Sequence, residues 1–222
     1  MTFELTPPLI KICCIASVAE AELAIESGAS AIGLVGHMPS GPGPIPDEKI
    51  AEIARSVPAG FPTFLLTSET SAAGVIRHHL ATKTTTIQLV DRLQSGSLGE
   101  IRSALPGITL VQVIHVTGPG SVEEAVRASE AADALLLDSG NPKLQVKELG
   151  GTGRTHNWSI SRTIVGRAKT PVYLAGGLNA ENVRDAIAQV GPYGVDVCSG
   201  VRTDGHLDRE RLSAFVHAVL NP

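Results

Sequence analysis

Eight short runs of β-branched and aliphatic residues alternate with helix-like stretches along the chain. The runs cover residues 9–14, 30–35, 62–67, 84–90, 108–116, 133–138, 171–176 and 194–200. They lack the alternation of polar and apolar residues that marks a strand with one wet face, so we expect parallel strands buried on both faces. Repeated units of strand and helix of this kind form either a closed (β/α)8 barrel or an open, doubly wound sheet.

The count of eight runs and the length of 222 residues favour the barrel. The composition, 43% hydrophobic and 3% aromatic, fits layered α/β packing better than a β-sandwich. No linker, low-complexity tract or close repeat divides the chain. We therefore expect an α/β fold in which residues 1–222 form a single (β/α)8 TIM-barrel domain.

Amphipathic stretches at residues 17–28, 121–132 and 179–191 carry apolar residues at helical spacing and predict helices between successive strands. The expected caps are Ser17, Ser121 and Asn179 at the helix N-termini, and Gly28 and Gly191 at the C-termini.

Charge and cysteine content argue against several classes of protein. The net charge is −4, the pI is near 6.0 and no run of Lys or Arg is present, so we expect no nucleic-acid partner. The longest apolar runs are too short to span a membrane, so we expect no membrane partner. Cys13, Cys14 and Cys198 are an odd set without paired spacing or a leading apolar signal segment, which predicts a reduced, cytoplasmic protein.

In a (β/α)8 barrel the active site forms where the strands end and the following loops begin. Two of these strand ends carry groups that can move protons, the thiol of Cys13 and the carboxylate of Asp138. An isolated aspartate at the end of an apolar strand more often caps the following turn, so this alternative stays open for Asp138. The loops after the second and sixth runs are long, which is typical of binding loops.

The first run reads LIKICC and contains a lysine that an apolar strand does not need. Lys11 and Cys13 share one face of this strand, and Cys14 is expected to point outward as a small packing residue. Lys11 either raises the thiolate fraction of Cys13 or pairs with a carboxylate deeper in the barrel. Gln88 also faces the interior by register, and we expect both Lys11 and Gln88 to border the substrate.

Three glycine-rich segments, residues 150–153, 175–179 and 198–201, follow late strands. Glycine lets the backbone approach a ligand closely, and backbone N–H groups bind phosphate without a lysine. Tight turns alone are the alternative, but two such segments at consecutive strand ends favour a phosphate site. The expected phosphate contacts are Gly151, Thr152, Gly153, Gly176, Gly177, Asn179, Ser199 and Gly200.

Four residues with aromatic or imidazole rings are given structural or local roles as well as functional ones. His115 ends the fifth run and either contacts substrate or hydrogen-bonds locally. Trp158 is expected to anchor the sixth helix. The adjacent His78 and His79 cannot place both rings on one metal, so no metal site is expected.

The chain resembles the phosphoribosylanthranilate isomerases of tryptophan biosynthesis. The matching segments are KIC at 11–13, LLLD at 135–138, GGTGRTHNW at 150–158, LAGGLNAENV at 174–183 and GVDVCSGV at 194–201. The resemblance implies a (β/α)8 barrel that performs an Amadori rearrangement of N-(5-phosphoribosyl)anthranilate. It implies Cys13 as the general base at the second sugar carbon and Asp138 as the general acid at the ring oxygen. Gly151, Gly177, Ser199 and Gly200 would surround the phosphate, and no cofactor or metal is required.

The chain departs from the family at several positions. Gly43 stands where the family has the arginine that holds the anthranilate carboxylate, and each hydrogen bond to such a charged group contributes about 1.5–3 kcal/mol. The other departures are Cys14 for a glycine, Val90 and Asp91 for His-Gly, His156 and Asn157 for Phe-Asp, and Arg202 for a glutamate.

These departures leave alternatives open. A divergent barrel could act on, or only bind, a different phosphorylated sugar metabolite. Another phosphate-using aldolase or epimerase is less favoured, because no clear Schiff-base lysine stands at a late strand end. Arg77, Arg154 and Arg202 are candidates for a relocated carboxylate contact, although an exposed role is the commoner one for each. The sequence is compatible with a monomer or a homodimer.

Overall fold

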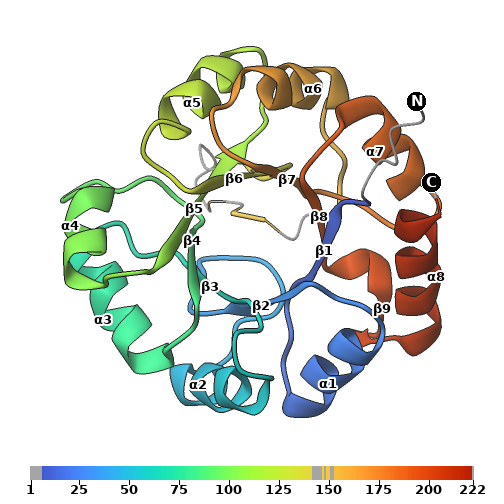
Figure 1. Ribbon diagram of the computed structural model, residues 1–222, viewed down its shortest axis with the longest axis horizontal. Helices are drawn as coiled ribbons and strands as arrows, with labels where there is room; N and C mark the ends of the chain where they lie inside the picture. The colour runs from blue at the N-terminus through green and yellow to red at the C-terminus, as the bar shows by residue number, and fades with distance from the viewer. Residues whose placement is uncertain (1–6, 142–146, 148, 151–152, 222) are drawn as a thin grey trace.

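A computed structural model describes residues 7–141, 147, 149–150 and 153–221 of the chain. Eight parallel strands close into a barrel in chain order, so the expected (β/α)8 architecture is confirmed (Figure 1). The barrel strands are β1 Leu9–Ile12, β2 Ala31–Val35, β3 Thr63–Thr67, β4 Thr86–Leu89, β5 Thr109–His115, β6 Ala134–Asp138, β7 Val172–Leu174 and β8 Gly194–Val197. Each strand is shorter than the run that predicted it.

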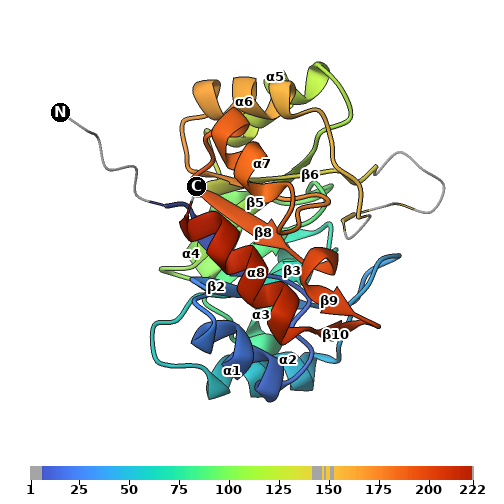
Figure 2. The same ribbon diagram turned by 90° about the vertical axis from the view of Figure 1, so that its right-hand side faces the viewer.

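Helices surround the barrel and cover its outer face (Figure 1). They are α1 Val18–Glu26, α2 Asp47–Ser56, α3 Ala72–Thr82, α4 Leu98–Ala104, α5 Gly120–Ala128, α6 Trp158–Arg167, α7 Val183–Val190 and α8 Arg209–Leu220. A short 3-10 turn, Ser199–Val201, follows β8 and leads into a small hairpin of β9 Arg202–Thr203 and β10 His206–Leu207. In the side view of Figure 2 this hairpin and the loop after β2 project from the same side of the barrel.

The helix caps agree with the sequence in part. Ser17 caps α1, since its Oγ accepts a hydrogen bond from the N–H of Glu20, and Gly191 ends α7 in the left-handed conformation. The prediction for Ser121 is wrong: α5 begins at Gly120, and the buried Ser121 hydroxyl donates to the carbonyl of His115.

The prediction for Asn179 is also wrong, because α7 begins only at Val183. The Oδ1 atom of Asn179 accepts hydrogen bonds from the N–H groups of Glu181 and Asn182 and so caps the turn before the helix. An asparagine can organise such a turn as readily as a helix N-terminus, and the sequence does not separate the two.

Strand alternation separates two apolar regions. Ile10 and Ile12 of β1 point outward into the layer between the barrel and its helices, whereas Phe64 and Leu136 belong to a cluster inside the barrel. The interior also contains charge. Lys11 is fully buried, and its Nζ donates to Oδ1 of Asp196, its register partner on β8, at 2.9 Å.

The Lys11 ammonium has two stabilising neighbours. Besides the carboxylate of Asp196, the ring of Phe64 lies 5.2 Å from Nζ, which adds a cation–π contact. Burial alone would lower the pKa of Lys11, but the charge of Asp196 outweighs this effect and raises that pKa above its ordinary value. Lys11 is therefore a cation that belongs to a polar layer of the barrel, the second of the two roles considered for it, and it also interacts electrostatically with Cys13.

We expect Lys11→Met to destabilise the protein by about 3–5 kcal/mol, because it leaves the carboxylate of Asp196 buried without its cation. Urea unfolding measures this loss. Adding Asp196→Leu to the same variant should recover most of it, since two apolar side chains then replace two charges. Lys169→Met, which breaks an exposed ion pair with Glu130, serves as the control and should leave the urea midpoint unchanged. A single Lys11→Met variant as stable as the parent would contradict the buried pair.

Candidate active site

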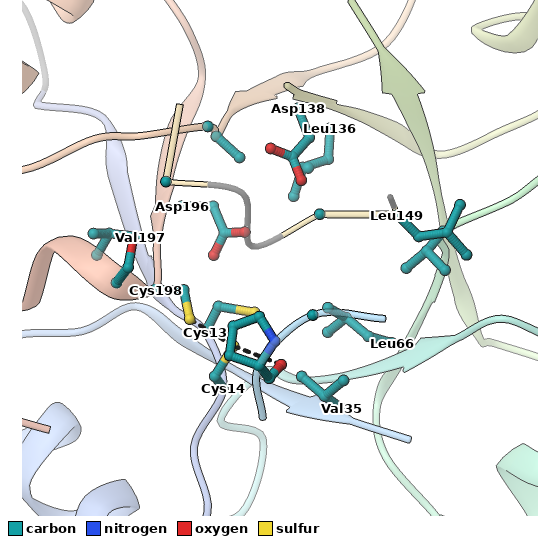
Figure 3. Close-up of a pocket in the computed structure, with 18 of the residues that line it drawn as sticks. Cys13, Cys14, Val35, Leu66, Leu136, Asp138, Leu149, Asp196, Val197 and Cys198 are labelled. Atoms are coloured by element: carbon teal, nitrogen blue, oxygen red, sulfur yellow. Dashed lines mark hydrogen bonds between the residues drawn. The ribbon is translucent and has the colours of Figure 1, made fainter. Parts of the chain in front are cut away.

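A pocket with a cavity volume of about 70 Å³, open to solvent on one side, lies at the C-terminal ends of the barrel strands. Its walls are mostly apolar, and the polar side chains of Gln88, Asp138 and Asp196 also line it, as does the thiol of Cys13. Figure 3 shows Asp138 on one side of this pocket and Cys13 on the other, with Asp196 between them. Apolar walls with a few polar groups at the strand ends of such a barrel are typical of a small-molecule site.

Cys13 follows β1 directly and is 5% exposed. Its backbone N–H donates to the carbonyl of Val197, which fixes it beside the end of β8. A Cβ atom placed on Gly33 would lie 2.9 Å from Cys13 Sγ and 3.0 Å from Lys11 Nζ. The thiol and the ammonium thus flank the same gap, and a glycine at position 33 leaves room for them. Lys11 itself lies below the pocket and does not line it.

Asp138 ends β6 and is 8% exposed. Its Oδ1 accepts a hydrogen bond from the N–H of Ser139 at 2.7 Å, so the turn-capping role considered from the sequence is present. The other oxygen borders the loop after β6: a Cβ on Gly150 would lie 2.6 Å from Oδ2. Asp138 therefore caps a turn through Oδ1. Its carboxylate also lines the pocket, where Oδ2 can take part in proton transfer.

The glycine-rich segments meet at the same pocket. Gly153, Gly176, Gly177 and Ser199 line it. Gly177 has φ +62, and a Cβ there would lie 2.7 Å from the backbone N of Thr155, so this glycine lets two loops pack closely.

The other residues predicted to contact phosphate do not line the pocket or are not described by the structure. Gly200 does not line the pocket: a Cβ at that position would lie 2.0 Å from the carbonyl oxygen of Leu178, so it serves loop packing. Asn179 does not line it either and is occupied with its own turn. Gly151 and Thr152 lie outside the described residues.

Gln88 points into the pocket as its register predicts. It is 3% exposed, and its Oε1 atom is buried without a hydrogen-bond partner. A buried acceptor without a partner is costly, and a ligand that donates a hydrogen bond would satisfy it. Gln88 Oε1 is thus an acceptor in the pocket that a hydrogen-bond donor on a ligand could pair with.

His115 and Trp158 have the simpler roles. The Nε2 atom of His115 lies 2.9 Å from the carbonyl oxygen of Val90, and the ring does not line the pocket. Trp158 begins α6 and packs against the outer core, as expected. No group of three or more His, Cys, Asp or Glu side chains in the described part of the chain is arranged to hold a metal ion.

The outward orientation expected for Cys14 is wrong. β1 ends at Ile12, so strand alternation no longer applies, and Cys14 adopts φ +62 and turns its side chain into the pocket. Its Sγ lies 2.6 Å from Sγ of Cys198. A residue other than glycine rarely adopts this left-handed conformation, which explains why a glycine would suit this position.

Gly43 packs directly on Cys14. It has φ +90, and a Cβ there would lie 2.7 Å from the Cβ of Cys14. No lysine or arginine among the described residues lines the pocket. Arg77 and Arg154 are exposed, Arg202 is partnered by Glu20, and none of these three side chains lines the pocket.

Arg202 holds the end of β1. One guanidinium nitrogen donates to Glu20 at 3.1 Å, and another donates to the carbonyl oxygens of Cys13 at 3.2 Å and Cys14 at 2.5 Å. Burial alone would raise the pKa of Glu20, but the hydrogen bonds from Arg202 and from the N–H of Leu207 hold it below its ordinary value. This clamp fixes the backbone that carries the pocket thiols.

Sequence reasoning missed Glu20, Gly150 and Asp196. For Asp196 a signal existed, because it shares a strand face with Cys198 and interrupts an apolar run. Gly150 begins a glycine-rich segment that was noted, although its contact with Asp138 was not. Glu20 gives no such signal, because it reads as an ordinary helix residue and its partner is 182 residues away.

A family model described as N-(5'phosphoribosyl)anthranilate (PRA) isomerase matches residues 10–218. The chain is 36% identical to an "N-(5'-phosphoribosyl)anthranilate isomerase 2" of Methanosarcina mazei over 214 residues, covering 96% of this chain and 94% of the relative. It is 33% identical to the N-(5'-phosphoribosyl)anthranilate isomerase of Methanocella arvoryzae, covering 88% and 89%.

Solved structures agree with the fold. The N-(5'-phosphoribosyl)anthranilate isomerase of Pyrococcus furiosus aligns with a TM-score of 0.77 and 29% identity, over 97% of this chain and all of the other. A phosphoribosyl anthranilate isomerase in complex with reduced 1-(o-carboxyphenylamino)-1-deoxyribulose 5-phosphate aligns with a TM-score of 0.76 and 25% identity, covering 96% and 98%. In the described part of this chain, no helix is long and apolar enough to cross a membrane.

We expect Arg202→Met to reduce stability by about 1.5–3 kcal/mol, because Glu20 and two carbonyl groups lose their charged donor. The loosened end of β1 should also make Cys13 and Cys14 react faster with iodoacetamide, as followed by mass spectrometry. Arg209→Met, whose guanidinium is exposed and 3.9 Å from Glu26, is the matched control and should change neither quantity. Unchanged thiol reactivity in Arg202→Met would show that the clamp does not restrain the thiols.

Proposed function

The chain belongs to the family of N-(5'-phosphoribosyl)anthranilate (PRA) isomerases, and we propose that Cys13 and Asp138 perform the family's reaction at the mouth of this barrel. The protein is an aldose–ketose isomerase of tryptophan biosynthesis, an intramolecular oxidoreductase. The observation that carries the residue assignment is that a strand-end thiol and a strand-end carboxylate line one pocket together with the glycine-rich loops.

In the proposed first step, Asp138 in its acid form donates a proton to the ring oxygen of the ribose. The bond between this oxygen and C1 breaks, and the nitrogen lone pair forms a C1=N bond. Asp138 suits this role because its carboxylate is held by hydrogen bonds from the N–H and the hydroxyl of Ser139 and still borders the pocket. A positioned acid or base of this kind contributes about 10²–10⁴-fold to a rate.

In the second step, the thiolate of Cys13 takes the proton from C2. The C–H electrons form a C1=C2 bond while the C1=N electron pair returns to nitrogen. The resulting enolamine loses its hydroxyl proton and gains a proton at C1 to give the aminoketose. C1 is reduced and C2 is oxidised within one molecule, so the chemistry is complete with proton transfers alone.

The phosphate end of the substrate would lie at Gly153, Gly177 and Ser199. This assignment is supported by their shared position on the pocket wall and by the ability of backbone N–H groups at such loops to bind phosphate without a basic side chain. Gly151 and Thr152, whose structure lies outside the described residues, are proposed as further phosphate contacts on the basis of the sequence. Gln88 would accept a hydrogen bond from a sugar hydroxyl through its unpaired Oε1.

The aromatic end of the substrate would contact the apolar wall formed by Val35, Met38, Leu66, Val90 and Leu149. This wall suits a planar ring. It offers no cation among the described residues for the carboxylate that anthranilate carries on that ring. Recognition of the carboxylate is therefore the weak element of this pocket, and we propose that the protein discriminates poorly between ring substituents.

We infer further that the protein works in the cytoplasm as one barrel domain, either as a monomer or as a homodimer. The chain is similar to a phosphoribosylanthranilate isomerase of Thermotoga maritima that is described as dimeric. The Cys13, Cys14 and Cys198 thiols are unbridged, which suits a reducing compartment.

Cys13→Ala and Asp138→Asn should each lower kcat by about 10²–10⁴-fold, because each removes one proton-transfer group. The assay follows turnover of N-(5-phosphoribosyl)anthranilate, together with growth of a tryptophan auxotroph that lacks the isomerase. Asp133→Asn is the matched control, since Asp133 lies at the opposite end of β6, where it pairs with Arg102. Full growth and turnover in both variants would contradict the assignment of Cys13 as the base and Asp138 as the acid.

We expect only weak preference for the anthranilate carboxylate. The ratio of kcat/KM for N-(5-phosphoribosyl)anthranilate to that for the phosphoribosyl adduct of aniline should stay below about tenfold. A charged hydrogen bond to the carboxylate, at about 1.5–3 kcal/mol, would make that ratio about 10–150-fold. A ratio in the higher range would reveal a cation that reaches the pocket and would contradict this reading of Gly43.

A pair of variants tests the same position. Gly43→Arg alone should impair folding or turnover, because its Cβ collides with Cys14 and the backbone is at φ +90. Adding Cys14→Gly removes the collision, and the double variant should recover turnover relative to Gly43→Arg. Equal impairment in both backgrounds would show that Cys14 does not obstruct position 43.

A further inference from the structure

Two thiols that the proposed chemistry does not use lie together at the rim of the pocket. Sγ of Cys14 and Sγ of Cys198 are 2.6 Å apart, at the ends of β1 and β8 (Figure 3). Both residues line the pocket, and neither is part of the acid–base pair. The short distance between two thiols does not by itself make them a reactive pair. The backbone contacts that hold Cys14 and Cys198 and the acidity of each thiol determine whether they can form a disulfide.

The backbone on both sides of the pair is fixed. Ile12 is the register partner of Val197, and the N–H of Cys13 donates to the carbonyl of Val197. Arg202 donates to the carbonyl of Cys14 and follows the short turn that begins after Cys198. An S–S bond is about 2.05 Å long, so the two sulfurs need only a small approach to form one.

The two thiols are not equivalent. The hydrogen bond between Cys198 and Cys14 and the nearby charge of Arg202 lower the pKa of Cys198, against the effect of burial. Hydrogen bonds to Cys13 and Cys198, together with burial, raise the pKa of Cys14. Cys198 is also the more exposed of the two. Cys198 is therefore suited to attack an oxidant, and Cys14 to resolve the product.

We propose that Cys14 and Cys198 form a dithiol modification site that a hydroperoxide converts into a disulfide. The Cys198 thiolate attacks one peroxide oxygen, the O–O bond breaks, and Cys198 becomes a sulfenic acid as water or an alcohol leaves. The Cys14 sulfur then attacks the Cys198 sulfur, the S–O bond breaks, and a second molecule leaves as water. Two thiols lose two electrons and two protons in total, and the peroxide is reduced. This site does not depend on the proposed catalytic roles.

The cross-link would have a structural effect. β1 and β8 are the first and last strands of the barrel, and they are hydrogen-bonded neighbours. A disulfide between residues 14 and 198 would join them covalently and enclose most of the chain in one loop. Cross-links that close long loops restrict the unfolded chain most, so the oxidised protein should unfold at a higher temperature than the reduced protein.

The test treats the reduced full-length protein with a small excess of hydrogen peroxide, blocks remaining thiols with iodoacetamide and measures the intact mass. The expected product has lost two hydrogens and carries a single alkyl group, on Cys13. Peptide mapping should show a linked pair containing Cys14 and Cys198, and dithiothreitol should reverse it. The unfolding temperature should rise by several degrees on oxidation and return on reduction.

Three variants identify the partners. Cys14→Ser and Cys198→Ser should each abolish the cross-link and the rise in unfolding temperature, whereas Cys13→Ser should form the cross-link at a rate within about twofold of the parent. A link through Cys13 would overturn the proposal, and so would a sulfinic acid on any cysteine while Cys14 and Cys198 remain open to alkylation. The peptide map of the parent protein decides the matter even where a variant fails to fold.

Discussion

The buried ion pair between Lys11 and Asp196 is the interaction on which the mouth of this barrel depends. It lies where the first strand meets the last, so it marks the line along which the ring of strands closes. Such a pair adds little net stability, but it specifies register, because a slip of one residue would leave both charges buried and unpaired. Cys13 lies two residues after Lys11, and Cys198 lies two residues after Asp196. The register that pairs Lys11 with Asp196 therefore also sets the positions of these two cysteines.

The fold and the position of the candidate site were predictable from the sequence because strand runs, helical spacing and strand-end polar groups are local patterns. Cys13 and Asp138 were found in this way, and both line the pocket. Cys14 was misplaced because a strand boundary shifted by two residues and a left-handed turn replaced the expected alternation. The Arg202–Glu20 clamp could not be predicted, since its partners are 182 residues apart and only the closed barrel brings them together.

The electrostatics of the pocket are unusual for a site that receives two anionic groups. Among the described residues, its ionisable side chains are the carboxylates of Asp138 and Asp196 and the thiols, while the ammonium of Lys11 lies below the pocket and is paired with Asp196. In the proposed phosphate site, attraction would rest on backbone N–H groups of the glycine-rich loops rather than on net charge. Such a site recognises the geometry of a phosphate and leaves the rest of the ligand to shape and apolar contact.

The contact between Gly43 and Cys14 also limits how this pocket can change over generations. The two positions share one small volume, in which a Cβ on residue 43 would lie 2.7 Å from that of residue 14. A side chain can therefore occupy one position or the other. A lineage that changes between arginine at position 43 with glycine at position 14 and the present arrangement must first replace the larger residue by glycine, before the other position can gain a side chain. The intermediate has glycine at both sites, with neither the arginine nor the second thiol.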